Sequence, residues 1–350
     1  MSTRGELKLI AIRSPTRPEQ SLAESYRLYW RTSMDKSSVE RKYIFGPVPS
    51  RRLGRSLGVD LVPYKTCTFD CIYCDLGRTT FKTTLRKSYV PTEEVQRELG
   101  LTLSSLERKP DYITLSGSGE PTLNQNIGEI IRTIKHLTSI PLAVLTNGSL
   151  LSFEEVRKDL VEADVVLPSL DAITPTVFEH INRPHPSLKI SEIIPGLIQF
   201  RKEYRGQIWL EVVFCRGIND GREEMDRLKR VIERIQPDRV QLNTPVRPPA
   251  EEFAYPLTTN QLEEVREKLG DKAEIISEFA APLGEELISM KDTEILNLVR
   301  RRPCTAEDIS KALGLRIDEV VKRLDHLIKR GTIRYRTYEH HGYYEGVPTS

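Results

Sequence analysis

The chain has 350 residues, 38% of them apolar and 29% charged, and its 52 basic and 50 acidic side chains leave a net charge of +2. These values exclude an acidic disordered protein and a uniformly basic nucleic-acid coat, and the length favours a large domain joined to a small one. No apolar run is long enough to span a bilayer, and five cysteines are too few for a disulfide scaffold. We therefore expect a cytoplasmic protein without a membrane segment.

The beginning of the chain is rich in Ser, Arg, Pro and Thr and shows no sustained hydrophobic period. Such a composition favours a flexible segment over a folded element, because it offers little apolar surface to bury. We expect residues 1–40 to form a flexible N-terminal extension.

A repeat of strands and helices is predicted for residues 41–288. Short β-branched runs alternate there with longer amphipathic stretches, which is typical of buried parallel strands covered by helices. The expected strands are Gly58–Val62, Tyr112–Ser116, Leu142–Thr146, Val165–Leu170, Ile208–Phe214 and Arg239–Asn243. The expected helices are Thr92–Leu106, Ile127–Leu137, Phe153–Val161, Ile190–Lys202 and Arg222–Ile235. Six such units predict an α/β fold, a partial (βα)6 parallel barrel whose ligands bind at the carboxyl ends of the strands.

Three short helices and a β-hairpin are predicted for residues 289–350. The helices are expected at Asp292–Arg301, from Thr305 onward, and at Asp318–Arg330. In the third helix, the side chains expected to face inward are Val320, Val321, Leu324, Leu327 and Ile328. The hairpin is expected within Thr332–Tyr344, with His341-Gly342 at its turn. This order of elements resembles a small winged helix-turn-helix domain.

Three cysteines, Cys67, Cys71 and Cys74, follow the first expected strand with C-x3-C-x2-C spacing. Thiols this close on one loop can converge on one metal centre. A structural zinc site normally has four ligands, whereas Cys215 and Cys304 stand alone and far away in the sequence. Three thiolates instead suit an iron-sulfur cluster in which one iron stays open to a further ligand.

At these residues the chain resembles the radical S-adenosylmethionine (radical SAM) superfamily, whose signature is a three-cysteine loop after the first barrel strand. The resemblance implies a 4Fe-4S cluster held by Cys67, Cys71 and Cys74, with SAM bound to the open iron. It further implies an oxidoreductase-like enzyme in which one electron, from a low-potential donor such as a ferredoxin or flavodoxin, cleaves SAM to a 5′-deoxyadenosyl radical. That radical abstracts hydrogen from a substrate that the motif does not identify.

The resemblance also implies which residues contact SAM. A Gly-rich loop after the second expected strand is similar to the family's Gly-Gly-Glu element, with Glu120 and backbone carbonyls receiving the SAM ammonium group. Polar side chains end the third and fourth strands and suit the ribose and the carboxylate, although Asn-Gly is also an ordinary turn sequence. The aromatic residue before the third cysteine would meet adenine through its backbone, and its ring could serve packing alone. The implied set is Tyr73, Gly117, Ser118, Gly119, Glu120, Asn147, Ser169 and Asp171.

A narrower likeness lies in Phe45–Gly58 and Asn243–Pro248, which are similar to the radical SAM enzymes of tRNA wybutosine synthesis. Those enzymes have a second cysteine triad near the N-terminus, and here no cysteine precedes Cys67. We therefore expect a relative with one cluster and a different substrate, with RNA or a protein docked by the winged domain.

Two features allow more than one interpretation. Arg51, Arg52 and Arg55 could grip phosphate or carboxylate, or form a solvated basic loop. Cys215 could donate hydrogen to a substrate radical, but a buried inert thiol is the simpler reading. The alternative function is an iron-sulfur transcription regulator that senses redox state or iron and places its third C-terminal helix in a DNA groove, although the charge of that helix is modest for such a role.

Overall fold

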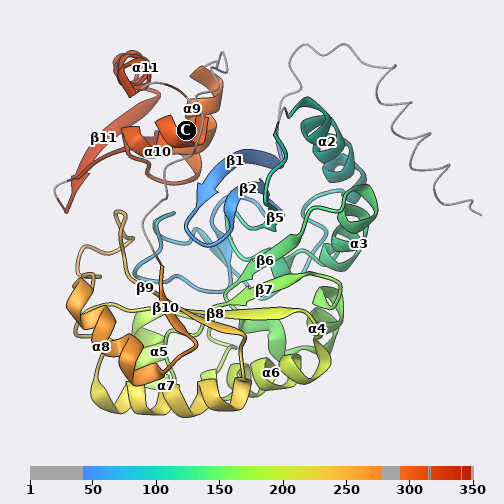
Figure 1. Ribbon diagram of the computed structural model, residues 1–350, viewed down its shortest axis with the longest axis vertical. Coiled ribbons are helices and arrows are strands. Elements are labelled where there is room, and N and C mark those ends of the chain that lie inside the picture. The colour runs from blue at the N-terminus through green and yellow to red at the C-terminus, as the bar shows by residue number, and fades with distance from the viewer. Residues whose placement is uncertain are drawn as a thin grey trace, which may run out of the picture. The chain divides into compact units, whose positions relative to one another are not determined.

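The computed structural model describes residues 42–276 apart from residue 107, and residues 292–347 apart from residues 314, 316 and 340 (Figure 1). The flexible extension predicted for residues 1–40 lies outside these ranges, as does the predicted domain boundary at residues 288 and 289. No helix in the described ranges is both long and apolar enough to cross a membrane.

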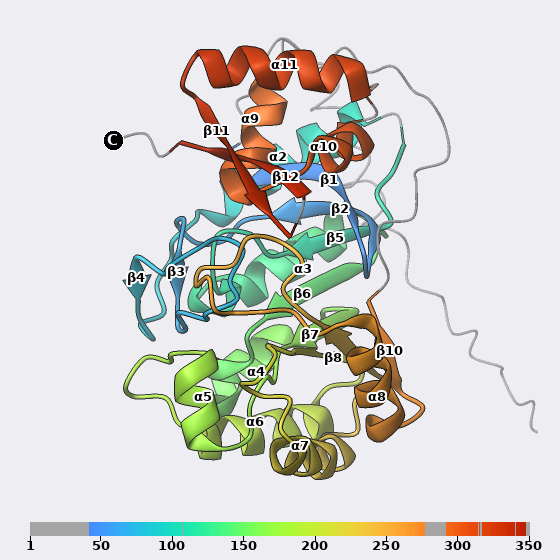
Figure 2. The ribbon, with the colours of Figure 1, turned by 90° about the vertical axis from the view of Figure 1, so that its left-hand side faces the viewer.

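One eight-stranded sheet has the strand order β1-β2-β5-β6-β7-β8-β9-β10. Its strands are β1 Ile44–Ser50, β2 Gly54–Val59, β5 Tyr112–Leu115, β6 Leu142–Thr146, β7 Val165–Pro168, β8 Gln207–Val213, β9 Arg239–Asn243 and β10 Ala273–Ile275. β1 and β2 form an antiparallel hairpin, and each following pair is parallel. Figure 2 shows β2, β5, β6 and β7 side by side. The predicted α/β fold with a mostly parallel sheet is confirmed.

The sequence prediction missed both edges of the sheet. β1 contains Pro47 and Pro49, and proline normally argues against a strand because it lacks a backbone N–H. An edge strand tolerates proline, since only one of its sides must pair. The first predicted strand, Gly58–Val62, is also displaced: β2 is Gly54–Val59, because its pairing with β1 draws the strand toward the N-terminus.

Helices lie along the outer side of the sheet (Figure 1). They are α2 Thr92–Ser105, α3 Ile127–Leu137, α4 Glu154–Leu160, α5 Pro175–Ile181, α6 Ile190–Glu203, α7 Arg222–Ile235 and α8 Thr259–Leu269. In α3 the buried isoleucines stand at positions 127, 130, 131 and 134, so one apolar stripe faces the sheet. α5 and α8 were not predicted, although Thr258 and Gln261 form a capping box that marks the start of α8.

The C-terminal elements follow the predicted order: α9 Asp292–Arg301, α10 Ala306–Leu313, α11 Ile317–Lys329, β11 Ile333–Tyr338 and β12 His341–Gly346. They share a hydrophobic cluster of their own. Two details of the prediction are wrong. Val321 and Ile328 are 46% and 37% exposed, because they lie to one side of the buried line of Val320, Leu324 and Leu327. The predicted turn at His341-Gly342 is also displaced, because His341 already pairs with Tyr338 as the first residue of β12.

The C-terminal elements also contact the larger part of the chain. Val48 of β1 packs against their hydrophobic cluster. The Tyr343 hydroxyl donates to the carbonyl of Val246, which follows β9, at 2.7 Å. Arg301 of α9 forms an ion pair with Asp60, just after β2, at 2.8 Å. These contacts bring the C-terminal elements to the strand ends that carry the predicted site.

Candidate cofactor site

The cysteine loop lies directly on the loop that follows β5. The amide of Lys65 donates to the Ser118 carbonyl at 2.6 Å, and the amide of Glu120 donates to the Thr66 carbonyl at 3.1 Å. A side chain at Gly119 would place its Cβ 1.8 Å from the Thr66 carbonyl oxygen. Only glycine permits this approach, which explains why a Gly-rich loop stands opposite the cysteines.

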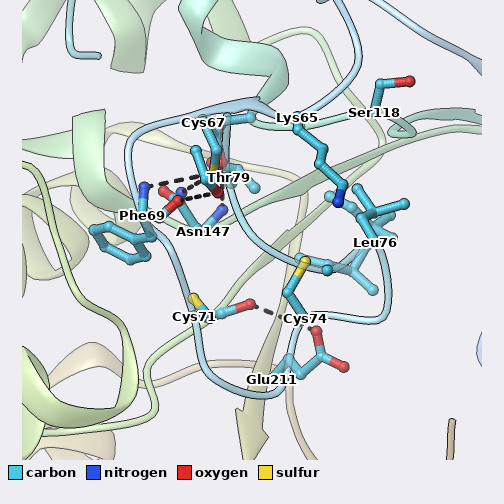
Figure 3. A pocket seen from close by; sticks show the side chains of 17 residues that line it. Lys65, Cys67, Phe69, Cys71, Cys74, Leu76, Thr79, Ser118, Asn147 and Glu211 are labelled. Carbon is cyan, nitrogen blue, oxygen red and sulfur yellow. Dashed lines mark hydrogen bonds between the residues drawn. The ribbon is translucent and has the colours of Figure 1, made fainter. Parts of the chain in front are cut away.

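The three predicted thiols line one cavity of about 180 Å³ (Figure 3). The cavity is also lined by Ser118, Gly119, Glu120, Asn147, Ser169 and Glu211, among others. The cysteines are free thiols and partly accessible. Burial raises the pKa of Cys67 and of Cys74 to about 12. A metal bound here would reverse that shift, because metal ligation deprotonates thiols.

The three thiols lie on one cavity but are not grouped around a single point. Within the described ranges, no three His, Cys, Asp or Glu side chains are grouped closely enough to hold one metal ion. An iron-sulfur cluster does not require such grouping, because each thiolate binds a different iron atom. Cys215 is buried outside the cavity lining, and Cys304 lies in the C-terminal hydrophobic cluster, so neither adds a fourth thiol.

Glu120 joins the loops after β5 and β6. One of its carboxylate oxygens accepts from the Thr146 hydroxyl at 2.7 Å and from the Thr122 amide at 3.0 Å. The other accepts from the Asn147 amide at 2.7 Å. Burial raises the pKa of this carboxyl, and these donors oppose the shift. The second oxygen has one donor and keeps acceptor capacity on the cavity side.

Asn147 links this carboxylate to the cysteine loop. Its side-chain amide donates to the Thr68 hydroxyl at 2.7 Å and approaches the Cys67 sulfur at 3.5 Å. Its side-chain oxygen accepts from the Ser149 amide at 3.0 Å. The structure thus brings Asn147 and Glu120 together with a cysteine, as expected from their places at strand ends.

A second carboxylate, Asp60, holds the Gly-rich loop from the opposite side. It accepts from the Ser118 amide at 3.0 Å and from the Ser118 hydroxyl, and it pairs with Arg301. Gly117 lies against the same carboxylate with a φ of 143°. Burial raises the pKa of Asp60, and Arg301 opposes the shift. Sequence reasoning missed this contact, because its partners are separated by 241 residues.

Asp171 and Tyr73 lie outside the lining of the main cavity. One oxygen of Asp171 accepts from the Tyr73 hydroxyl at 2.5 Å and from the Asn182 side chain at 2.8 Å. The other accepts from the Val213 amide at 2.8 Å. Asn182 also approaches the Cys71 sulfur at 3.4 Å. Burial raises the pKa of Asp171 to about 6. Asp171 and Asn182 line a smaller pocket beside the cavity, and their bonds to Tyr73 and Cys71 hold the cysteine loop there.

Ser169 does line the cavity, and beside it stands Glu211, which was not predicted. Glu211 pairs with Arg52 at 2.7 Å and accepts from the Asn243 side chain at 3.1 Å. Burial opposes ionisation of Glu211, but Arg52 outweighs it and the pKa is lowered. A glutamate inside the apolar strand β8 was the available signal, because a buried charge in a sheet needs a partner.

The three predicted arginines separate in the structure. Arg51 donates to the Asn243 side-chain oxygen at 3.2 Å, near Arg52 and the cavity. Arg55 is the second residue of β2, and its backbone amide donates to the Asp111 carboxylate at 2.7 Å.

Comparison with known proteins agrees with this site. Residues 61–230 match the model of the radical SAM superfamily. The chain is 34% identical over 278 residues to the UPF0026 protein MJ1312 of Methanocaldococcus jannaschii, covering 77% of this chain and 85% of that protein. The chain belongs to the UPF0026 family of radical SAM proteins. The predicted cofactors, a 4Fe-4S cluster and SAM, are thereby confirmed, and the chain is an enzyme.

Two further relatives differ in length and name. A protein of Brachyspira hyodysenteriae named GTPase Obg is 37% identical over 302 residues, and the match covers 85% of this chain. The chain spans only 44% of that longer protein. The dual-specificity RNA methyltransferase RlmN of Buchnera aphidicola is 24% identical over 236 residues, covering 64% of this chain and 61% of that enzyme.

Proposed function

We propose that this UPF0026 protein holds a 4Fe-4S cluster on Cys67, Cys71 and Cys74 and binds SAM in the adjoining cavity. When both are bound, the cluster supplies one electron that cleaves SAM reductively to a 5′-deoxyadenosyl radical for hydrogen abstraction. The observation that carries the proposal is the single cavity lined by all three thiols, Glu120 and Asn147. The proposed electron source is a low-potential donor such as a ferredoxin or flavodoxin.

The side chains of the cavity have distinct tasks in this proposal. Glu120 and the backbone beside Gly119 receive the ammonium group, because the second Glu120 oxygen keeps acceptor capacity. Asn147 and Ser169 face the polar parts of the ligand, and Gly117 and Ser118 shape the loop on Asp60. Tyr73 and Asp171 act as positioning residues, since their side chains form a hydrogen bond with each other outside the lining of the cavity.

Anaerobic reconstitution tests the proposal. The full chain, loaded with iron and sulfide and given SAM and dithionite, should release 5′-deoxyadenosine, measured by chromatography. Cys71→Ala should abolish the release, because a cluster with two thiolates is not held. Cys304→Ala is the matched control, since Cys304 lies in the C-terminal cluster, and it should retain cleavage. Equal release from wild type and Cys71→Ala would refute the proposal.

For the substrate we propose RNA. Support comes from the relative named RNA methyltransferase and from the predicted likeness to tRNA wybutosine-synthesis enzymes. The C-terminal elements, interpreted as a winged helix-turn-helix domain, are proposed to dock it beside the cavity. Mass spectrometry of RNA from cells with and without the gene should show one missing modified nucleoside. An unchanged nucleoside profile with a changed protein profile would favour a protein substrate.

The regulator alternative has no observation in its favour. A sensor needs a cluster but no cavity lined by strand-end polar groups beside it. Here the three thiols share their cavity with Glu120, Asn147 and Ser169.

A further inference from the structure

A group of four arginines adjoins the cavity through Arg52, which pairs with Glu211 of the cavity lining. Arg51 and Arg52 stand in the turn between β1 and β2, and Arg247 follows β9. Arg302 follows α9. Three segments far apart in the sequence supply these arginines, and the charge of Arg247 acts on both Arg51 and Arg302.

Backbone contacts bring Arg302 to the loop of Arg247. Cys304, two residues after Arg302, forms a β-bridge with Tyr344 of β12. The neighbouring Tyr343 donates its hydroxyl to the carbonyl of Val246. Arg302 and Arg247 thus belong to segments that the same strand joins.

Carboxylates pair with only some of these arginines. Arg52 pairs with Glu211, and Arg247 lies 3.8 Å from Asp308. The side chain of Arg51 donates to Asn243, an uncharged partner. Among the residues that the structure describes, the Arg302 guanidinium makes no hydrogen bond or ion pair. Burial lowers the pKa of Arg302, and the positive charge of Arg247 lowers it further.

Nearby carboxylates offset only part of this positive charge: Glu211 and Asp75 act on Arg51, and Asp75 and Asp308 act on Arg302, yet burial and the neighbouring arginines outweigh them. Burial lowers the pKa of Arg51 to about 10, and the charges of Arg247 and Arg52 add to the effect. Desolvated guanidinium groups that face each other gain most from an oxyanion, which accepts bidentate charge-assisted hydrogen bonds from them. A tetrahedral phosphate offers oxygens in several directions and so suits donors from three segments better than a planar carboxylate.

We propose that Arg51, Arg247 and Arg302 bind a phosphate group of the substrate, whose reacting part enters the cavity past Glu211. This inference rests on the proposed function, because it takes the cavity to be the place of reaction. It adds that the substrate carries phosphate and that the C-terminal segment supplies part of its binding site. The phosphate could belong to an RNA backbone or to a free nucleotide.

Phosphate binding by the full chain, loaded with cluster and SAM, tests the proposal. Inorganic phosphate is the probe, and its binding is measured by the broadening of its ³¹P resonance. Arg302→Gln should weaken the dissociation constant by about tenfold or more, because one charge-assisted contact is lost. Arg302→Lys should lose less phosphate affinity, because lysine keeps the positive charge but cannot make two parallel hydrogen bonds to one phosphate. Arg132→Gln is the matched control: Arg132 is an exposed arginine of α3, and its loss should change nothing.

Two competitors identify the source of the phosphate. A short RNA without terminal phosphates that displaces the probe indicates a backbone phosphodiester, whereas displacement by AMP alone indicates a nucleotide. Absence of binding to the wild type, or equal binding by wild type and Arg302→Gln, overturns the proposal. A change in the cluster's paramagnetic spectrum with unchanged phosphate binding also overturns it, because the arginines would then serve the cluster. Arg51→Gln replaces Arg302→Gln if that variant fails to fold, as judged by circular dichroism.

The readouts separate this inference from the proposed function. Release of 5′-deoxyadenosine without phosphate binding refutes only the phosphate site. Phosphate binding without release of 5′-deoxyadenosine refutes only the proposed reaction.

Discussion

The loop after β5 and the segment after β7 both end a parallel strand, and both carry a buried carboxylate. Glu120 in the first lines the cavity of the cysteines, and Asp171 in the second does not. Each carboxylate accepts at least three hydrogen bonds from the chain. The position at a strand end is therefore insufficient to assign a ligand contact.

The difference follows from what each carboxylate holds. Glu120, in the Gly-rich loop, accepts a hydrogen bond from the Asn147 amide, and both residues line the cavity. Asp171 ties Tyr73 of the cysteine loop to Asn182 after α5. Glu120 therefore lies beside the space that the three thiols share, whereas Asp171 lines a smaller pocket of about 10 Å³ next to it. We therefore expect that equivalent substitutions in the two regions will both lower the free energy of unfolding, and that only the substitution at Glu120 will weaken SAM binding.

The largest effect is expected where the two loops touch. Gly119→Ala forces a Cβ to within 1.8 Å of the Thr66 carbonyl, so the cysteine loop must move away. Because displacement by about an ångström can cost a hundredfold in rate, release of 5′-deoxyadenosine should fall by about a hundredfold or more. Iron content and the cluster's absorption should fall with it.

Gly221→Ala is the control for this change. Gly221 begins α7 with an ordinary φ of −65°, and an added Cβ meets no atom within 4 Å. This variant should keep its cluster and its cleavage rate. If Gly119→Ala behaved like Gly221→Ala, the close contact between the loops would not position the thiols.

An intermediate effect is expected from a matched pair, Glu120→Gln and Asp171→Asn. Each change replaces a carboxylate oxygen with an amide that faces existing donors, so each should lower the free energy of unfolding by about 1–3 kcal/mol. Only Glu120→Gln should weaken SAM binding, by about tenfold or more, since only that side chain lines the cavity. Titration of SAM, followed by the spectrum of the reduced cluster, measures both affinities. Equal loss of SAM affinity in the two variants would contradict the distinction between the regions.

Local patterns predicted much of this site, but not its long-range contacts. Cysteine spacing and strand-end position predicted that Cys67, Glu120 and Asn147 lie close together, and these residues line one cavity, because parallel strands end at one edge. Asp171 lines a smaller neighbouring pocket instead, because its carboxylate accepts from Tyr73 and Val213, which are distant in the sequence. The ion pair of Asp60 with Arg301 joins segments 241 residues apart, and no period or motif encodes such a pairing.

The smallest effect is expected from the ion pair between Asp60 and Arg301, which holds the loop after β5 through Ser118. Asp60 holds Ser118 and pairs with Arg301, whose guanidinium also stacks over the Phe45 ring at 4.1 Å. Arg301→Gln removes a mostly buried ion pair, so the free energy of unfolding should fall by about 1–3 kcal/mol. SAM affinity should fall by about threefold to tenfold, since Ser118 loses a fixed anchor.

The pH dependence of SAM affinity tests the role of the Asp60–Arg301 ion pair more sharply. Burial raises the pKa of Asp60 and Arg301 opposes it, so removal of Arg301 raises the pKa further. Protonation then removes the carboxylate that accepts from Ser118, and the SAM defect of Arg301→Gln should grow as the pH falls. Arg301→Lys should restore most of the affinity. Arg334→Gln, which removes an exposed ion pair with Glu345, should leave SAM affinity unchanged. A SAM defect that does not vary with pH would assign Arg301 to packing against Phe45 and not to the charge of Asp60.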